Sequence, residues 1–118
     1  MASGTLKKRS SNEISITPIS NSNYTAISGE YSLISNGIVA VLTIGFQVVS
    51  PSSSSIQVFT LPTGYRPKVY LNRAAVGRNK NLTDQTLPLR FSISPSGKVE
   101  FSGGTSGDRY FESITYPI

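Results

Sequence analysis

The feature that most constrains this chain is an alternation of apolar and polar side chains, which turn residues interrupt about every ten positions. Successive side chains of a β-strand point to opposite faces, so this alternation gives each strand one apolar face. No segment shows the three-and-four spacing of an amphipathic helix. The pattern predicts an all-β fold without significant helix: an antiparallel sandwich or barrel of about eight strands.

The longest apolar run, residues 38–49, predicts a strand that is buried on both of its faces. One face carries only apolar side chains, namely Ile38, Ala40, Leu42, Ile44, Phe46 and Val48. The opposite face is also largely apolar in its first half, so that half needs a covering surface of its own. In a small antiparallel domain, this surface is either another sheet or another subunit.

Turn residues mark the boundaries between neighbouring strands. Asn36-Gly37 predicts a two-residue hairpin, because both residue types accept positive φ. Ser94-Pro95-Ser96-Gly97 suits a type I turn followed by a G1 bulge. Residues 51–55, a proline followed by serines, indicate a polar surface loop.

The closing segment, residues 109–118, predicts a last strand whose inward face has two alternatives. Either Phe111 points inward, or Tyr110, Ile114 and Tyr116 do. Because the alternation slips in this segment, we expect a β-bulge there.

The length of 118 residues suits one domain. We expect residues 1–11 to be a disordered leader or a linker from an upstream segment, and residues 12–118 to form a single β-sandwich. The net charge is +5, but Lys7, Lys8 and Arg9 supply three of the basic residues. Without them, the remaining eight basic residues exceed the six acidic ones by two, which does not favour a nucleic-acid-binding face. No apolar run has the length of a transmembrane helix, so we expect no membrane insertion.

The residue types that are missing exclude most catalytic sites. The chain has neither Cys nor His, so Ser-His-Asp and Cys-His nucleophilic sites are impossible and the usual zinc ligands are absent. The acidic residues lie in polar loops or in strand positions that alternate with apolar neighbours. This arrangement favours turn-forming and solvated carboxylates over the catalytic pair of a glycosidase. We therefore expect no enzyme activity, no metal and no cofactor.

Polar residues gather around two predicted loops, one spanning residues 77–85 and one spanning residues 103–108. In the strand that precedes the first loop, Tyr70 and Asn72 share one face, while Val69 and Leu71 share the other. Planar guanidinium, amide and carboxylate groups beside Tyr rings are suited to sugar hydroxyls or phosphate oxygens. The predicted ligand-binding residues are Tyr70, Arg73, Arg78, Asn79, Asp84, Asp108, Arg109 and Tyr110. The alternative is that these loops are polar only because they are exposed.

Four segments follow one another in a distinctive order: Asn36-Gly37-Ile38-Val39 at a hairpin, Phe59 to Pro67 with the sequence FTLPTGYRP, Ile93 to Val99 with the sequence ISPSGKV, and the closing Tyr110 to Pro117. In order and spacing, this set resembles the modules at the C-terminal end of bacteriophage tail and baseplate proteins. In the second segment, two prolines and a glycine predict a rigid corner between strands. The Trp of the family's closing strand is absent from this chain.

The resemblance implies a receptor-binding head domain from a phage of Gram-positive bacteria. Such domains are antiparallel β-sandwiches of jelly-roll-like form, which makes this fold the expected one. They are typically trimeric, and many of them bind cell-wall saccharide or teichoic acid. The expected function is therefore that of a trimeric adhesin at the tail tip or baseplate of the virion, which contacts a host cell-wall glycan and other tail proteins. The same module also occurs as a structural or accessory domain that docks to neighbouring tail proteins, and this is the alternative function.

Overall fold

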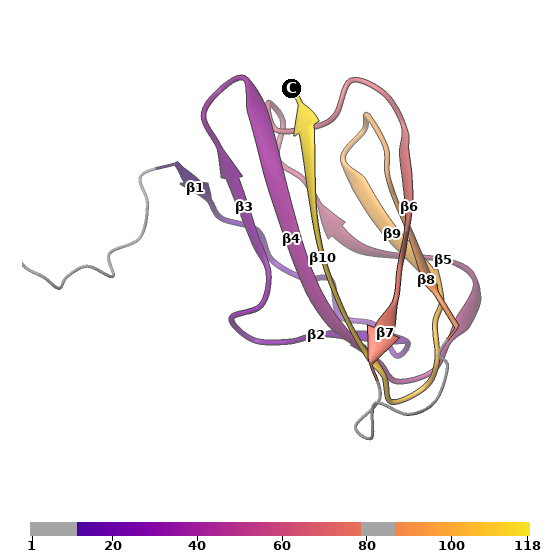
Figure 1. Ribbon diagram of the computed structural model, residues 1–118. Helices are drawn as coiled ribbons and strands as arrows, with labels where there is room; N and C mark the ends of the chain where they lie inside the picture. The colour runs from indigo at the N-terminus through magenta and orange to yellow at the C-terminus, as the bar shows by residue number, and fades with distance from the viewer. Residues whose placement is uncertain (1–11, 79–86) are drawn as a thin grey trace, which may run out of the picture.

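Ten β-strands form two antiparallel sheets in the computed structural model, which describes residues 12–78 and 87–118 (Figure 1). These described residues contain no helix, and hence none that could cross a membrane. The structure confirms the predicted all-β antiparallel fold and shows that it is a sandwich and not a barrel. The leader predicted for residues 1–11 lies outside the described residues.

The first sheet has six strands, and its central strand is β4. The strands are, in spatial order, β1 (Glu13–Ile14), β3 (Ser32–Ser35), β4 (Val39–Val48), β10 (Arg109–Pro117) and β7 (Gly77–Arg78), while β2 (Tyr24–Ala26) pairs with the far end of β4. The second sheet has four strands, in the order β5 (Ser52–Thr60), β9 (Lys98–Gly103), β8 (Leu89–Ile93) and β6 (Leu71–Ala75).

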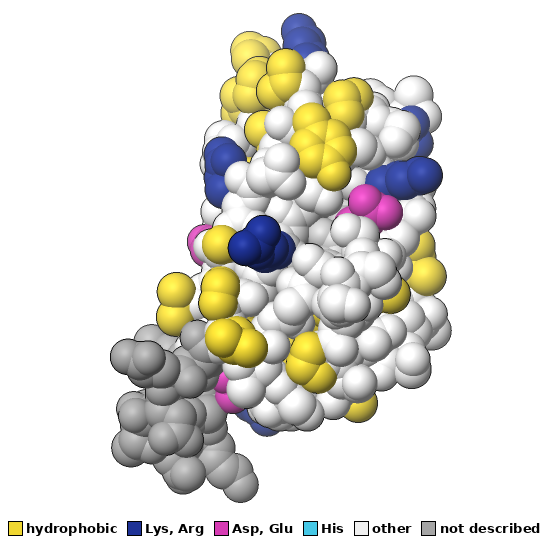
Figure 2. All heavy atoms as spheres, turned by 90° about the vertical axis from the view of Figure 1, so that its right-hand side faces the viewer, with side chains coloured by type: hydrophobic (Ala, Val, Ile, Leu, Met, Phe, Trp, Pro, Cys, Tyr) yellow, Lys and Arg dark blue, Asp and Glu magenta, His cyan; other side chains and the backbone are white. Residues whose placement is uncertain are grey.

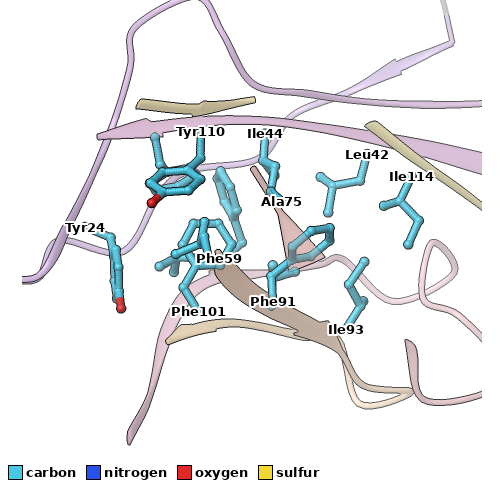
Figure 3. Close-up of a cluster of buried hydrophobic side chains, with 14 of the residues drawn as sticks. Tyr24, Leu42, Ile44, Phe59, Ala75, Phe91, Ile93, Phe101, Tyr110 and Ile114 are labelled. Carbon is cyan, nitrogen blue, oxygen red and sulfur yellow. The ribbon is translucent and has the colours of Figure 1, made fainter. Parts of the chain in front are cut away.

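The core fills the space between the two sheets. In β4 the side chains of Ala40, Leu42, Ile44, Phe46 and Val48 are buried, as the alternation predicts. Ile38, predicted on the same face, lies in the turn before β4 and is 71% exposed. Aromatic rings of the two sheets meet edge to face: the Phe46 and Phe101 rings are 4.7 Å apart at 82°, and those of Phe46 and Phe59 are 5.7 Å apart at 85°. The side chains that Figure 3 labels include Leu42, Ile44, Tyr110 and Ile114 from the six-stranded sheet and Phe59, Phe91, Ile93 and Phe101 from the four-stranded one.

Within the described chain, the outer face of β4 is covered at Gly45 by the backbone of Glu30, but no third layer of strands covers the rest of it. On this face Ile34 lies opposite Val41, and Phe111 lies opposite Gly45. Ile34 is 40% exposed and Phe111 is 47% exposed. The sequence left open whether another sheet or another subunit covers this face. In the described structure, no other sheet lies over Ile34 or Phe111. We call the face around Ile34, Val41 and Phe111 the outer apolar face.

Residues 52–55 differ from the prediction, because they belong to β5 and not to a surface loop. Ser52 pairs with Gly103 across the sheet, and the ladder shifts register between Ser52 and Ile56. The Ser52 amide donates to the hydroxyl of the buried Tyr24, at 3.1 Å. A polar segment becomes a strand here because its backbone groups find partners, although its side chains bury little apolar surface.

Both predicted hairpins are present, but the first turn is displaced by one residue. The Asn36 amide donates to the Val39 carbonyl, which places Gly37 and Ile38 at the centre of the turn. The Asn36 side chain instead accepts hydrogen bonds from the amides of Ile38 and Val39, at 2.8 and 3.0 Å. At residues 94–97 the amide of Gly97 donates to the Ser94 carbonyl, as the predicted type I turn requires.

The closing strand β10 contains no bulge, so that prediction is wrong. Its register with β4 is continuous from Arg109 to Pro117, and Tyr110, Ile114 and Tyr116 face the core. The alternation slips only in the sequence, because Glu112 occupies an inward position opposite Ile44. The register shifts lie instead between β5 and β9.

Three of the segments that carry the family resemblance meet at one end of the sandwich. Leu61 donates its amide to the Gly97 carbonyl at 2.8 Å, and Arg66 Nε donates to the Leu61 carbonyl at 2.8 Å. The Tyr116 hydroxyl donates to the Tyr65 carbonyl at 2.8 Å. We call these five residues the corner clasp. They join the rigid corner to a hairpin and to the last strand, so their role in this structure is architectural.

Candidate functional site

A shallow pocket lies on the outer face of the four-stranded sheet, beside Tyr70. Its volume is about 210 Å³, and its lining residues are Ser55, Tyr70, Asn72, Arg90, Phe91, Ser92, Glu100 and Ser102. We call this site the Tyr70 pocket. The side of the molecule on which β5, β6, β8 and β9 lie in Figure 1 is shown in Figure 2, where basic and acidic side chains are scattered and do not merge into one charged patch.

Strand alternation places these polar side chains together. In β8 and β9, Phe91 and Phe101 lie opposite each other and point into the core, so their neighbours point outward. Ser92 lies opposite both Asn72 and Glu100, and one step along the sheet Arg90 lies opposite Ser102. A row of polar groups thus crosses three strands.

Tyr70 adds an exposed aromatic ring to this row. It lies three residues after Pro67, which ends the corner, and directly before β6, and it is 55% exposed. The predicted pairing of Tyr70 with Asn72 on one strand face agrees with the lining of the pocket. An aromatic ring next to hydroxyl, amide and charged groups offers both a stacking surface and hydrogen bonds.

The polar side chains of the Tyr70 pocket are not used by the fold. Within residues 12–78 and 87–118, no hydrogen bond or ion pair engages the side chains of Tyr70, Asn72, Arg90, Ser92, Glu100, Ser102 or Ser55. Many other polar side chains are engaged, as when Asn21 Oδ1 accepts from the amides of Asn23 and Tyr24 at 2.8 and 2.7 Å. The pocket therefore keeps its donors and acceptors for a ligand or for water.

A larger hollow of about 320 Å³ lies between the segment 18–21 and the segment 24–31. It is lined by Pro18, Ile19, Ser20, Asn21, Tyr24, Thr25, Ala26, Ser28 and Tyr31, none of which is charged. Tyr24 and Asn21 both serve the fold, because the Tyr24 hydroxyl donates to the Gly103 carbonyl at 2.9 Å and Asn21 caps the turn before β2. This hollow offers fewer uncommitted groups than the Tyr70 pocket.

Arg73 and Arg109 are exposed, but neither lines the Tyr70 pocket. Arg73 follows Asn72 on β6 and lies opposite Phe91, so it occupies the core-facing side of an edge strand. Its Nη1 donates to the Asn72 carbonyl at 3.0 Å. Arg109 begins β10 in the other sheet, where its backbone lies opposite that of Arg78 in β7.

Asp108 and Tyr110 are buried, with exposures of 2% and 1%, and this corrects their prediction as surface ligand-binding residues. The Tyr110 hydroxyl donates to the Leu87 carbonyl at 2.6 Å and accepts from the Thr105 amide at 2.9 Å. A Cβ on Gly77 would overlap the Tyr110 ring, so the ring packs directly on that strand. Tyr110 thus holds loops together from inside the core.

The remaining predicted residues are not brought to the pocket by the described structure. Asn79 and Asp84 lie outside the described residues. Arg78 is placed only through its backbone, which pairs with β10. Of the predicted set, Tyr70 alone lines the Tyr70 pocket among the residues whose side chains are described.

Sequence reasoning missed most of the pocket because its residues come from strands and not from loops. Arg90, Ser92, Glu100 and Ser102 stand at alternate positions beside Phe91 and Phe101. Alternation alone marks such positions as outward-facing. It does not show that β6, β8 and β9 are neighbours, which is the arrangement that makes a site.

The tyrosines with raised pKa values lie in the core and not in the pocket. Burial raises the pKa of Tyr116 to about 12. Burial also raises the pKa of Tyr24, and the hydrogen bond from the Ser52 amide opposes this effect in part. Both hydroxyls serve the fold. The described residues hold no group of three or more acidic side chains that could bind a metal ion.

No protein-family model matches this chain, and no curated protein matches its sequence.

Proposed function

We propose that this chain is a receptor-binding head domain of a phage tail or baseplate, which recognises a saccharide or teichoic acid on the host cell surface. The Tyr70 pocket carries the proposal: an exposed aromatic ring lies beside a row of amide, hydroxyl, guanidinium and carboxylate groups that the fold does not use. Sugar recognition needs this combination of an apolar ring surface and planar hydrogen-bonding groups.

A shallow site of this size suits weak binding that several copies reinforce. A volume of about 210 Å³ is below the usual range for pockets that enclose a drug-sized ligand. Linked copies raise the effective affinity without any new contact, provided that they reach the ligand together. A trimer whose subunits meet through the outer apolar face would supply such copies and would cover the half-exposed Ile34 and Phe111.

Adsorption of the purified chain to a panel of Gram-positive cells tests the proposal. We expect Tyr70→Ala to weaken binding about tenfold, because a stacked aromatic ring contributes roughly 1–1.5 kcal/mol. Val69→Ala is the matched control, since Val69 is the preceding residue, is 63% exposed and does not line the pocket. If no cell type and no wall polymer binds the chain, the adhesin proposal is wrong.

The alternative is a structural module that docks to neighbouring tail proteins through the outer apolar face. The exposure of Ile34 and Phe111 favours this function over a free monomer. Binding to a purified baseplate protein, lost on Phe111→Ser and unchanged by Tyr70→Ala, would favour the structural role. Binding to cells, lost on Tyr70→Ala, would favour the adhesin.

A further inference from the structure

The Tyr70 pocket contains one cationic and one anionic side chain, which form no ion pair with each other in the described structure. Arg90 lies opposite Ser102 and Glu100 lies opposite Ser92, so Arg90 and Glu100 are diagonal neighbours on adjacent strands. Such neighbours are about 7 Å apart between backbones. Neither side chain forms an ion pair or a hydrogen bond within the described residues. Both charges therefore face the pocket independently.

The pair restricts the charge of a ligand that fills the pocket. A hydroxyl group can donate to the Glu100 carboxylate, and its oxygen or that of a neighbouring hydroxyl can accept from the Arg90 guanidinium. Adjacent hydroxyls of a sugar ring meet both requirements at once. A phosphodiester oxygen could accept from Arg90, but it would also face the negative charge of Glu100 without a proton to donate.

The nearby basic side chains of Lys98 and Arg73 do not add positive charge to the lining of the pocket. Lys98 lies on β9 two residues before Glu100 on the same side of the strand, but it does not line the pocket. Arg73 is on the opposite side of β6 from Asn72. Among the lining residues, the charges are those of Arg90 and Glu100 alone, so the pocket has no net positive charge to attract a polyanion.

We infer that the ligand of the Tyr70 pocket is an uncharged, polyhydroxylated saccharide whose hydroxyls bridge Glu100 and Arg90 while its ring stacks on Tyr70. This inference rests on the proposed function and specifies it, since it selects neutral glycan over the phosphate chain of teichoic acid. Asn72 and the hydroxyls of Ser92 and Ser102 supply the further hydrogen bonds along the same row.

The test compares the binding of two variants, in each of which one glutamate is replaced by glutamine. Glu100→Gln removes the charge in the pocket, and Glu112→Gln is the control, because Glu112 is a half-buried carboxylate on β10 in the other sheet. Both variants have the same net charge, and circular dichroism verifies that each is folded. The probes are an array of uncharged bacterial polysaccharides and a synthetic poly(glycerol phosphate) chain, each measured at low and at high salt.

We expect Glu100→Gln to weaken binding to an uncharged polysaccharide about tenfold, since a hydrogen bond to a charged group is lost. Glu112→Gln should leave this binding unchanged, and the affinity should vary little with salt because the ligand carries no charge.

Two results would overturn the inference while leaving the adhesin proposal intact. One is binding to poly(glycerol phosphate) that falls steeply with salt and that Glu100→Gln strengthens. The other is binding to an uncharged polysaccharide that Glu100→Gln does not alter. Absence of binding to cells and to every polymer would instead refute the proposed function itself.

Discussion

Replacing Gly97 with alanine should destabilise the fold, because the added methyl group strains the backbone and displaces Arg66 from the corner clasp. Gly97 has φ of +89°, in a region that costs an L-residue about 1–2 kcal/mol. An added Cβ would lie 2.5 Å from Arg66 Nε and 2.8 Å from the Leu61 carbonyl oxygen. Arg66 can move aside, but only by giving up its 2.8 Å hydrogen bond to that same oxygen.

The expected magnitude adds these two effects. A hydrogen bond from a charged group contributes about 1.5–3 kcal/mol when it is well formed. Together with the backbone strain, Gly97→Ala should lower the free energy of unfolding by roughly 2.5–5 kcal/mol. Gly64→Ala is the matched control, because Gly64 lies in the same corner with φ of +96° and has no atom within 4 Å of its Cβ position. It should cost only the backbone strain of about 1–2 kcal/mol.

Urea unfolding followed by circular dichroism measures both variants together with Arg66→Ala and the double variant. Because either substitution breaks the Arg66–Leu61 hydrogen bond, the cost of the double variant should fall short of the sum of the single costs by about 1 kcal/mol or more. Equal costs for Gly97→Ala and Gly64→Ala, or strict additivity with Arg66→Ala, would refute the description of the clasp.

Three further predictions concern the outer side of β4, the pH dependence of folding and self-association. Gly45→Ala should destabilise the fold by about 2–4 kcal/mol in the same urea assay, because its Cβ would lie 2.6 Å from Glu30 Cβ and 2.8 Å from the Glu30 carbonyl oxygen. A loss below about 0.5 kcal/mol would show that Glu30 does not pack tightly on Gly45. Because burial raises the pKa of Tyr116 from 10.0 to about 12, its contribution to stability is complete below pH 10 and is lost as the pH rises through about 12. Between pH 9 and 12, the free energy of unfolding should therefore fall less with rising pH for Tyr116→Phe than for the parent chain. An identical pH dependence in the two proteins would contradict this role of Tyr116. Phe111→Ser should turn the proposed trimer into a monomer in light scattering with little change in monomer stability, whereas a parent chain that is already monomeric would exclude this interface.

Within the bounds of β4 and β8, the alternation predicted which side chains fill the core, although it could not show that Ile38 lies in the turn before β4. Phe46, Phe91 and Ile93 are buried as the two-residue period requires. The hairpin at residues 94–97 was predictable for the same kind of reason, since Pro and Gly limit the local backbone to few conformations. These features depend on neighbours in sequence, which a single chain displays directly.

The errors occurred where tertiary contacts outweighed local preference. Ser52 joins a strand because Gly103 and Tyr24 provide partners for its backbone. Glu112 takes an inward position because β10 keeps its register with β4 along its whole length. Neither partner can be identified from residues nearby in the sequence.

For the candidate site, the sequence by itself determined that no binding surface of this chain uses Cys, His or Trp, since these residues are absent. It also placed Tyr70 and Asn72 on one strand face, because side chains alternate along a strand. Only the tertiary structure decided that Arg90 and Glu100 join them, while Tyr110 and Asp108 are buried. The physical reason is that strand order and sheet packing are set by contacts between distant segments, and these contacts determine which outward-facing side chains become neighbours.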